Sequence, residues 1–250
     1  TTGYEEAASQ GMMAGLNAAL KNRDEAPLVL KRDEAYIGVL IDDLVNKGTE
    51  EPYRMFTSRA EYRILLRQDN ADLRLTEMSH KLGFADEKRN ARAVEKREGV
   101  AAIQEIMARV SVTPAQMDGI LEAAGTTRLK QTVKAESIIG RPGITLAHLA
   151  EGSPELKAEF ERFDIETLEQ AEIQVKYRGY IRKERELAEK MVRLDDIRLP
   201  DTFNYHKVTA LSYEGREKLS RVRPSSLGQA SRISGVTPAD ISVLMIFIGR

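Results

Sequence analysis

Cysteine is absent from the 250-residue sequence, as is tryptophan. Without cysteine, the chain can form no disulfide, no thiolate zinc site and no cysteine nucleophile. Its three histidines, His80, His148 and His206, lie far apart in the sequence and lack the spacing of metal ligands. We therefore expect no metal site in this chain.

Long hydrophobic runs are also missing. The most apolar stretch is ISVLMIFIG at residues 241–249, which is too short to span a bilayer. The N-terminus shows no signal-peptide pattern. Hydrophobic residues make up 42% and charged residues 31% of the chain, a composition typical of a globular protein. We expect a cytoplasmic protein that does not contact membranes.

The net charge of −1 does not indicate nucleic-acid binding, but the basic residues are unevenly distributed. Residues 176–224 contain thirteen lysines or arginines against eight acids, and residues 54–74 contain five arginines against three acids. Such segments can form basic surface on a neutral protein. The alternative is solvated helix faces with paired charges, which composition alone favours.

Helical periodicity dominates the sequence, and proline and glycine fall mostly at the edges of the periodic segments. We therefore predict a mainly α-helical fold. The expected elements are helices over residues 4–20, 35–48, 59–67, 86–110 and 165–198, a helix starting at 113–114, the short helix LAHLAE, a brief strand at 55–57, a turn from Thr76 to Leu82 closed by Gly83, and three or four short capped helices in the last fifty residues. Irregular residues 125–154 mark a candidate domain boundary.

The first predicted helix begins at once, in TTGYEEAASQGMMAGLNAAL. Acids in its first turn suit the helix dipole, and its free N–H groups can bind anions or electron-rich acceptors such as a cofactor carbonyl. One side carries only small residues: Ala7, Gly11, Ala14, Gly15 and Ala18. Polar Gln10 lies beside Gly11, where the backbone is open to a planar ligand. An ordinary packed helix is the alternative, and spacing alone favours it.

An arginine-rich segment follows in PYRMFTSRAEYRILLRQDNADLRLT. Ser58 and Glu61 have the spacing of a capping box, which predicts a short helix with Arg59, Arg63 and Arg67 on one face. Three guanidinium groups on one face suit phosphates, because each can bind two oxygens. Equally, nearby acids could neutralise them in buried ion pairs; these are Glu61, Asp69 and Asp72.

The stretch KYRGYIRKERELAEK alternates basic and aromatic residues. Such a pattern can bind an RNA backbone and stack on bases. The residues concerned are Lys176, Arg178, Arg182, Lys183, Arg185, Tyr177 and Tyr180. Three glutamates at 184, 186 and 189 instead allow a salt-bridged, solvated helix, and the pattern alone favours this alternative.

The tail, SSLGQASRISGVTPADISVLMIF, has the order of a helix-turn-helix motif. Thr237 is expected to cap its second helix, with Pro238 first. That helix starts with apolar side chains, so we expect contact with protein or bulk RNA rather than base readout. Ile241 and Leu244, followed by Met245 and Ile248, form an apolar stripe, part of which must close the tail's own core. Arg232 is expected at the exposed rim of this surface.

Four of these stretches together resemble the GidA/MnmG family: TTGYEEAASQG, EPYRMFTSRAEYRILLRQDNADLRLTE, EIQVKYRGYI and SLGQASRISGVTPADI. The resemblance runs from Thr1 to Arg250 in family order. It implies the C-terminal two-fifths of an FAD-dependent large subunit that forms 5-carboxymethylaminomethyl-uridine at the tRNA wobble position. It also implies a GTPase partner subunit, a homodimer, and NADH and folate as co-substrates of the full-length enzyme.

The resemblance further implies three regions: residues 1–50 as the C-terminal edge of an α/β FAD-binding domain, 51–150 as a linking helical region, and 151–250 as a helical tRNA- and partner-binding domain. The family's phosphate-binding glycines and catalytic cysteines belong to the N-terminal part. No GxGxxG occurs in this chain, so we expect it to bind little FAD and to be inactive alone. Its catalytic residues stay unassigned.

By resemblance, Gln10 and Gly11 contact the flavin, with Gly3 and Tyr4 close by. Arg67 is implied in tRNA contact or active-site organisation. The further implied tRNA-binding or active-site residues are Arg63, Arg74, Arg59, Lys176, Arg178 and Arg182, and the implied partner-binding residues are Arg232, Ile241 and Leu244. Two alternatives are a stand-alone helical RNA- or protein-binding module and a folate- and FAD-dependent tRNA methyltransferase. The block from Glu172 to Arg250 argues against the methyltransferase.

Overall fold

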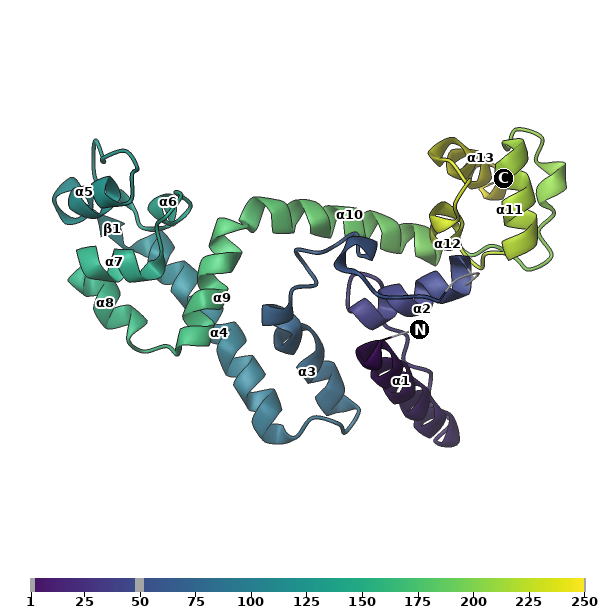
Figure 1. The fold of residues 1–250 in the computed structure, drawn as a ribbon, viewed down its shortest axis with the longest axis horizontal. Coiled ribbons are helices and arrows are strands. Elements are labelled where there is room, and N and C mark those ends of the chain that lie inside the picture. Colours follow the sequence, from purple (N-terminus) through teal and green to yellow (C-terminus); the bar gives the residue numbers. More distant parts are fainter. Residues whose placement is uncertain (1–2, 48–51, 250) are drawn as a thin grey trace. The chain divides into compact units, whose positions relative to one another are not determined.

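The computed structural model describes residues 3–47 and 52–249, which form a mainly helical protein (Figure 1). Within that part, thirteen α-helices and three short 3-10 helices accompany one two-stranded antiparallel ladder. This confirms the predicted fold class. The chain divides into two compact units: the first consists of residues 1–66 and 183–250, and the second of residues 67–182.

The first unit begins with α1 (Tyr4–Asn22), which packs against α2 (Tyr36–Lys47). Met13, Leu16 and Leu20 are buried, and their spacing places them on one face of α1. Both predicted helices are confirmed. The predicted end of the second helix at Gly48 lies outside the described residues.

Residues 55–67 do not form the predicted strand and helix. They contain one 3-10 helix, η1 (Thr57–Arg59), followed by turns. The Ser58–Glu61 capping box is replaced because the Glu61 carboxylate accepts a hydrogen bond from Arg32 Nη2 at 2.6 Å. The Glu184 carboxylate accepts the backbone N–H groups of Ile64 and Leu65, both at 3.0 Å. Long-range contacts with Arg32 and Glu184 therefore stabilise turns where local spacing predicts a helix.

The remaining elements of the first unit build the tail. They are the greater part of α10 (Arg178–Asp196), η3 (Tyr205–Lys207), α11 (Tyr213–Val222), α12 (Leu227–Arg232) and α13 (Pro238–Ile248). Their core includes fully buried Leu219, Leu227 and Leu244. Thr237 caps α13 as predicted, through a capping box with Asp240, and Pro238 occupies the first turn. The expected series of short capped helices is confirmed.

Asp240 joins two of these helices. It is 2% exposed, and its carboxylate accepts the backbone N–H of Ser212 at 2.7 Å and of Thr237 at 2.9 Å. The hydroxyls of Ser212 and Thr237 also donate to it, at 3.0 and 2.7 Å. Burial opposes ionisation of this carboxyl, but the four hydrogen bonds outweigh it and lower the pKa of Asp240.

We predict that Asp240→Ala lowers the free energy of unfolding of the tail by about 1–3 kcal/mol, because buried N–H groups lose their acceptor. Since the folded-state pKa is lowered, this contribution is present above the unfolded pKa of about 3.9 and is lost as pH falls through the folded pKa. Urea unfolding at pH 7 and pH 3 measures both effects. Equal losses at the two pH values would contradict the role of the ionised carboxylate.

The second unit holds one core around its longest helix. Its elements are η2 (Gln68–Asn70), α3 (Ala71–Lys81), α4 (Glu87–Arg109), β1 (Ser111–Val112), α5 (Pro114–Ala123), β2 (Val133–Lys134), α6 (Glu136–Ile139), α7 (Leu146–Gly152), α8 (Pro154–Phe160) and α9 (Ile165–Lys176). Helix α4 packs against α3 and α9. Ile103, Met107 and Leu121 are fully buried in the core. In the ladder, Ser111 pairs with Lys134 and Val112 with Val133.

Local capping explains why two helices here match their predictions. The Asp86 side chain accepts the Arg89 N–H at 2.8 Å and begins α4. Thr113 and Gln116 form a capping box at α5, with Pro114 in its first turn. The short helix LAHLAE is confirmed as α7. Helix α6 and the β1–β2 ladder have no counterpart in the sequence prediction.

Two expectations differ from the structure in this region. Thr76 lies inside α3 rather than capping a turn, although Gly83 does end the segment with a positive φ of 83°. The single helix expected over residues 165–198 is two helices, interrupted at Tyr177 (φ −98°, ψ 8°). Gly179, which has low helix propensity, follows the interruption.

Two absences apply to the described residues. None of their helices combines the length and apolarity needed to cross a membrane. In the same residues, no group of three or more histidine, aspartate or glutamate side chains is arranged to hold a metal ion.

Candidate functional site

Helix α1 presents its small-residue stripe at the surface of the first unit. Ala7, Gly11, Ala14 and Ala18 are exposed, and a Cβ added at Gly11 would meet no other atom within 4 Å. No bulky side chain covers this strip of backbone, so a flat partner can approach the helix closely. Gln10, beside it, is half-buried.

The N-terminus of α1 already holds a carboxylate. Glu6 Oε1 accepts the backbone N–H of Met55 at 3.0 Å. Hydrogen bonds from Met55 N–H and from its own N–H lower the pKa of Glu6. A Cβ at Gly3 would overlap this carboxylate, so any larger residue there would have to displace the Glu6 side chain. Tyr4 is 94% exposed. Because one negative charge already offsets the helix dipole, the helix start suits an uncharged acceptor, such as a ring carbonyl, better than a phosphate.

Arg67 lies in a network within the second unit. Its Nη2 donates to Gln170 Oε1 at 2.9 Å, and its Nε donates to Asp69 at 3.1 Å. Gln170 is 1% exposed and donates back to Asp69 at 2.7 Å. Arg74 donates to the Arg67 carbonyl at 3.1 Å and to Asn70 at 2.8 Å. Both arginines therefore fix the QDNAD turn against α9 and α3.

Lys96 of α4 completes this cluster. The ammonium group donates to Asp72 at 2.9 Å and lies 3.4 Å from the Asp69 carbonyl. Its side chain is 9% exposed. Of the two alternatives for the arginine segment, the ion-paired network is the one observed at Arg67.

The expected face of three arginines does not form. Arg59 and Arg63 belong to the first unit and Arg67 to the second. Arg59 donates to the Arg54 carbonyl at 2.9 Å, and its guanidinium lies 4.3 Å from the centre of the Tyr53 ring. Arg63 is exposed and makes no hydrogen bond or ion pair with any described residue. Within the described segment, it is therefore the arginine most open to an added anion.

We predict that Arg67→Ala lowers the free energy of unfolding by about 1–3 kcal/mol, because buried Gln170 loses a partner. Arg63→Ala is the matched control, and we expect less than about 0.5 kcal/mol, as for other exposed side chains. Chemical denaturation of both variants provides the measurement. Equal stability of the two variants would show that the Arg67 network does not stabilise the second unit.

The basic segment near Tyr177 has features of both alternatives, the salt-bridged helix and the exposed basic and aromatic surface. Lys176 pairs with Glu172 at 2.6 Å, and Arg178 pairs with Glu136 at 3.2 Å. Nevertheless, Tyr177 and Tyr180 are exposed, with ring centres 6.3 Å apart, and Arg182 is exposed as well. The two rings and nearby cations thus remain accessible although two of the cations have acidic partners.

The predicted apolar stripe of the tail points mainly inward. Ile241 is 8% exposed and Leu244 is fully buried in the tail's core, so they are not surface residues. The exposed apolar residues of α13 are instead Met245, Ile246 and Phe247. Helical spacing did not show which part of the stripe closes the core.

The prediction that Arg232 lies at an exposed rim is wrong. Its side chain is 11% exposed. The Nε atom lies 2.9 Å from Asp42 Oδ2, and Nη2 lies 3.0 Å from Asp195 Oδ1. Asp42 lies 190 positions earlier in the sequence, so no local pattern reveals this pairing.

Arg32 forms the centre of a buried ion cluster that the sequence analysis missed. Nη1 lies 2.8 Å from Asp43 and 2.9 Å from Asp42, and Nη2 lies 2.6 Å from Glu61. Asp43 is fully buried and also accepts the Tyr53 hydroxyl at 2.7 Å. A detectable signal is the pair of aspartates inside the otherwise apolar helix YIGVLIDDLV, because buried charges need partners.

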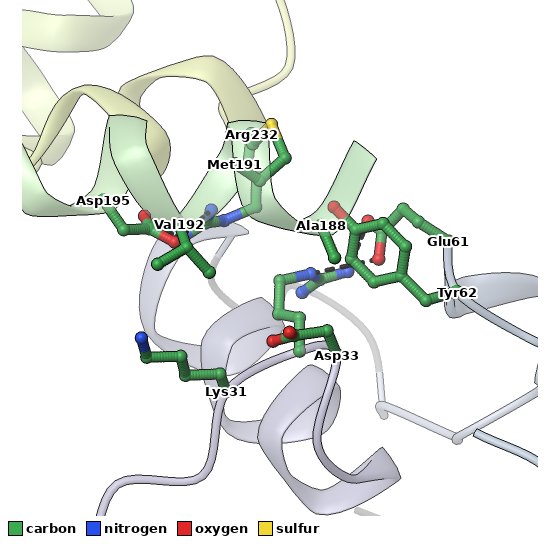
Figure 2. Close-up of a pocket in the computed structure, with 10 residues that line it drawn as sticks. Lys31, Asp33, Glu61, Tyr62, Ala188, Met191, Val192, Asp195 and Arg232 are labelled. Carbon is green, nitrogen blue, oxygen red and sulfur yellow. Dashed lines mark hydrogen bonds and ion pairs between the residues drawn. The ribbon is translucent and has the colours of Figure 1, made fainter. Parts of the chain in front are cut away.

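A cavity of about 100 Å³ opens beside this cluster (Figure 2). Charged groups and apolar side chains share its wall: Lys31, Arg32, Asp33, Glu61, Tyr62, Ala188, Met191, Val192, Asp195 and Arg232. Burial, followed by the negative charge of Glu61, raises the pKa of Tyr62 to about 12. The phenol is therefore neutral at physiological pH.

Comparisons with known proteins match the whole chain to one family. Residues 187–250 match the model of the tRNA modifying enzyme MnmG/GidA C-terminal helical bundle, and residues 87–185 that of the MnmG/GidA C-terminal helical domain. Residues 1–26 match the model of glucose inhibited division protein A, which agrees with the expected short piece of a cofactor domain. The chain belongs to the MnmG/GidA family and corresponds to its C-terminal region.

Two curated relatives show how far the match extends. Both are described as tRNA uridine 5-carboxymethylaminomethyl modification enzyme MnmG. The protein of Flavobacterium psychrophilum is 55% identical and that of Cytophaga hutchinsonii 54% identical, each over all of this chain. The chain spans 40% of the length of each relative. A crystal structure of Aquifex aeolicus GidA is also similar, with a TM-score of 0.76 and 38% identity over the whole chain and 39% of that structure.

Proposed function

We propose that this chain supplies the C-terminal part of a flavoprotein that forms 5-carboxymethylaminomethyl-uridine at the wobble position of tRNA. The observation that carries the proposal is the 55% identity, over the entire chain, to a relative named for this modification. Because the chain spans 40% of that relative, the activity belongs to the whole protein. NADH and folate are proposed as its co-substrates.

We propose that α1 forms one edge of the FAD site. The exposed backbone at Gly11 leaves room for a flat ring. The Glu6 carboxylate already offsets the helix dipole near Gly3, which favours an uncharged ring. Gln10 and Tyr4 would border the ring, and Glu6 would keep the first turn in place. The bound flavin supplies the redox and one-carbon chemistry. The phosphates of FAD require cations or a glycine-rich turn, and the open face of α1 offers neither.

RNA and protein contacts are proposed for different surfaces. Arg59, Arg63 and the segment from Lys176 through Arg178 to Arg182 are the candidate tRNA contacts, supported by exposed guanidiniums and by the two exposed tyrosines near Arg178. Arg67 and Arg74 are proposed to act in active-site organisation rather than to hold phosphate, since their guanidiniums are held by partners within the second unit. On α13, exposed Met245, Ile246 and Phe247 would face the GTPase partner. A homodimer is proposed for the full-length protein.

We predict that the purified 250-residue chain binds little FAD, whereas the full-length protein binds it near stoichiometrically. The reason is that α1 alone offers a ring contact and no phosphate site. Absorbance near 450 nm after equilibration with FAD measures occupancy. A chain that retains near-stoichiometric flavin would contradict this division of the site.

We also predict that Gly11→Leu in the full-length protein reduces flavin occupancy and tRNA uridine modification at least about tenfold, because the side chain fills the space needed for close approach. In the isolated chain the same change should stabilise α1 by about 0.5–1 kcal/mol. Nucleoside mass spectrometry of tRNA measures modification.

Gly119→Leu is the matched control, since Gly119 is also an exposed helical glycine with no atom within 4 Å of an added Cβ. It should stabilise α5 similarly and leave flavin and modification unchanged. Full flavin occupancy in the Gly11→Leu protein would exclude α1 from the cofactor site.

A further inference from the structure

Arg232 connects the tail to the N-terminal segment of the first unit. It comes from α12 and shares the Asp42 carboxylate of α2 with Arg32, at 2.9 Å in each case. Arg232 also pairs with Asp195 of α10 at 3.0 Å. Figure 2 shows Arg232 and Asp195 on one side of the cavity and Glu61 on the other. Four stretches of sequence, at residues 32–42, 61, 195 and 232, thus meet around two guanidiniums.

The polar contacts continue from this point to α1. Arg32 pairs with Asp43 at 2.8 Å, and Asp43 accepts the Tyr53 hydroxyl at 2.7 Å. Two residues after Tyr53, the Met55 N–H donates to Glu6 in the first turn of α1 at 3.0 Å. These contacts, together with the backbone from Tyr53 to Met55, therefore connect the tail to the N-terminus of α1 within the first unit.

The charges of this network depend on one another. Arg32 is 8% and Asp43 0% exposed at the side chain, so neither can replace a lost partner with bulk water. Removing Arg232 takes one cation from Asp195, whose side chain is 33% exposed, and one from Asp42, which is 17% exposed and keeps its contact with Arg32. Loss of a partner is most destabilising where the remaining charge is buried. Asp42 would then compete for Arg32 and weaken its hold on Asp43. Because neighbouring residues of the network share hydrogen-bond partners, we expect the loss of Arg232 to weaken the contacts of Asp43 and Tyr53 as well.

We propose that this network is a conformational link through which the tail sets the position of the N-terminal turn of α1. With Arg232 engaged, Asp42, Asp43, Tyr53 and Glu6 are held. When a ligand of the tail withdraws Arg232, for which the adjoining cavity leaves room, the first turn of α1 loosens. The proposed link depends only on the ion pairs and hydrogen bonds described above. Its effect on flavin binding rests on the proposed function.

Hydrogen exchange with mass spectrometry on the full-length protein tests the link. We expect Arg232→Met to speed amide exchange at least about tenfold in α2 and in residues 3–10, while α4 and α5 of the second unit keep their rates. Arg221→Met is the control, because Arg221 is exposed and has no ion pair in the described part of the chain. Faster exchange confined to α11–α13 would overturn the proposal.

A second variant covers the case in which Arg232→Met unfolds the tail. Tyr53→Phe removes one hydroxyl from the middle of the network, and it should speed exchange in residues 3–10 with the tail intact. Where both single variants fold, the double variant should exchange in residues 3–10 no faster than Arg232→Met alone, because both changes cut one link. Unchanged exchange in Tyr53→Phe, or additive effects in the double variant, would overturn the link.

Flavin titration of the same proteins separates the link from the proposed function. If exchange in residues 3–10 rises and FAD affinity falls about tenfold, both stand. If exchange rises and FAD affinity is unchanged, the link stands and the placement of the flavin at α1 is wrong. If FAD affinity falls without faster exchange in residues 3–10, the link is wrong.

Discussion

The pairing of Arg32 with Asp43 is the constraint on which the first unit depends. Asp43 lies fully buried in α2, where Val39 and Leu40 are also buried, and a carboxylate in that position needs several hydrogen-bond donors. Arg32 and the Tyr53 hydroxyl supply them. The same guanidinium holds Glu61, so the chain before α2 and the turns after η1 are fixed by one side chain. The tail joins through Arg232, which shares Asp42.

The sequence separation between hydrogen-bonded partners explains which elements were predicted correctly. Helices α4, α5 and α13 start at Asp86, Thr113 and Thr237, whose capping partners lie three residues ahead. A pattern of that length is visible in the sequence. The segment from Arg59 to Arg67 has an equally good local pattern. Its turns are nevertheless held by Arg32 and Glu184, which lie far away in the chain, so local periodicity gave the wrong element.

The partners of the candidate site residues could not be predicted from the sequence either, and the reason is chemical. A guanidinium binds carboxylate and phosphate with the same planar geometry, so a sequence cannot tell a clamp for RNA from an internal ion pair. Arg67 and Arg232 were both predicted to face ligands, and both are held by carboxylates of their own unit. Gly11, in contrast, was predicted from small-residue spacing and does lie on an open surface. Glycine has no side chain that could pair with a residue inside the protein, so its exposure was easier to predict than the contacts of an arginine.

In the first unit, several charged side chains are buried while an uncharged strip of α1 is exposed. The charges of Arg32, Arg232 and Asp43 are inside, while the open strip of α1 is neutral and small. The ionised Glu6 further offsets the dipole at the start of that helix. A ligand on this strip is therefore selected by flatness and by hydrogen bonds rather than by net charge. Phosphate groups, whether of a cofactor or of RNA, gain most where guanidiniums keep their hydration and lack acidic partners. On the described surface of the first unit, Arg63 is one arginine that meets this condition, so the proposed ring-binding and phosphate-binding tasks would lie on different parts of the chain.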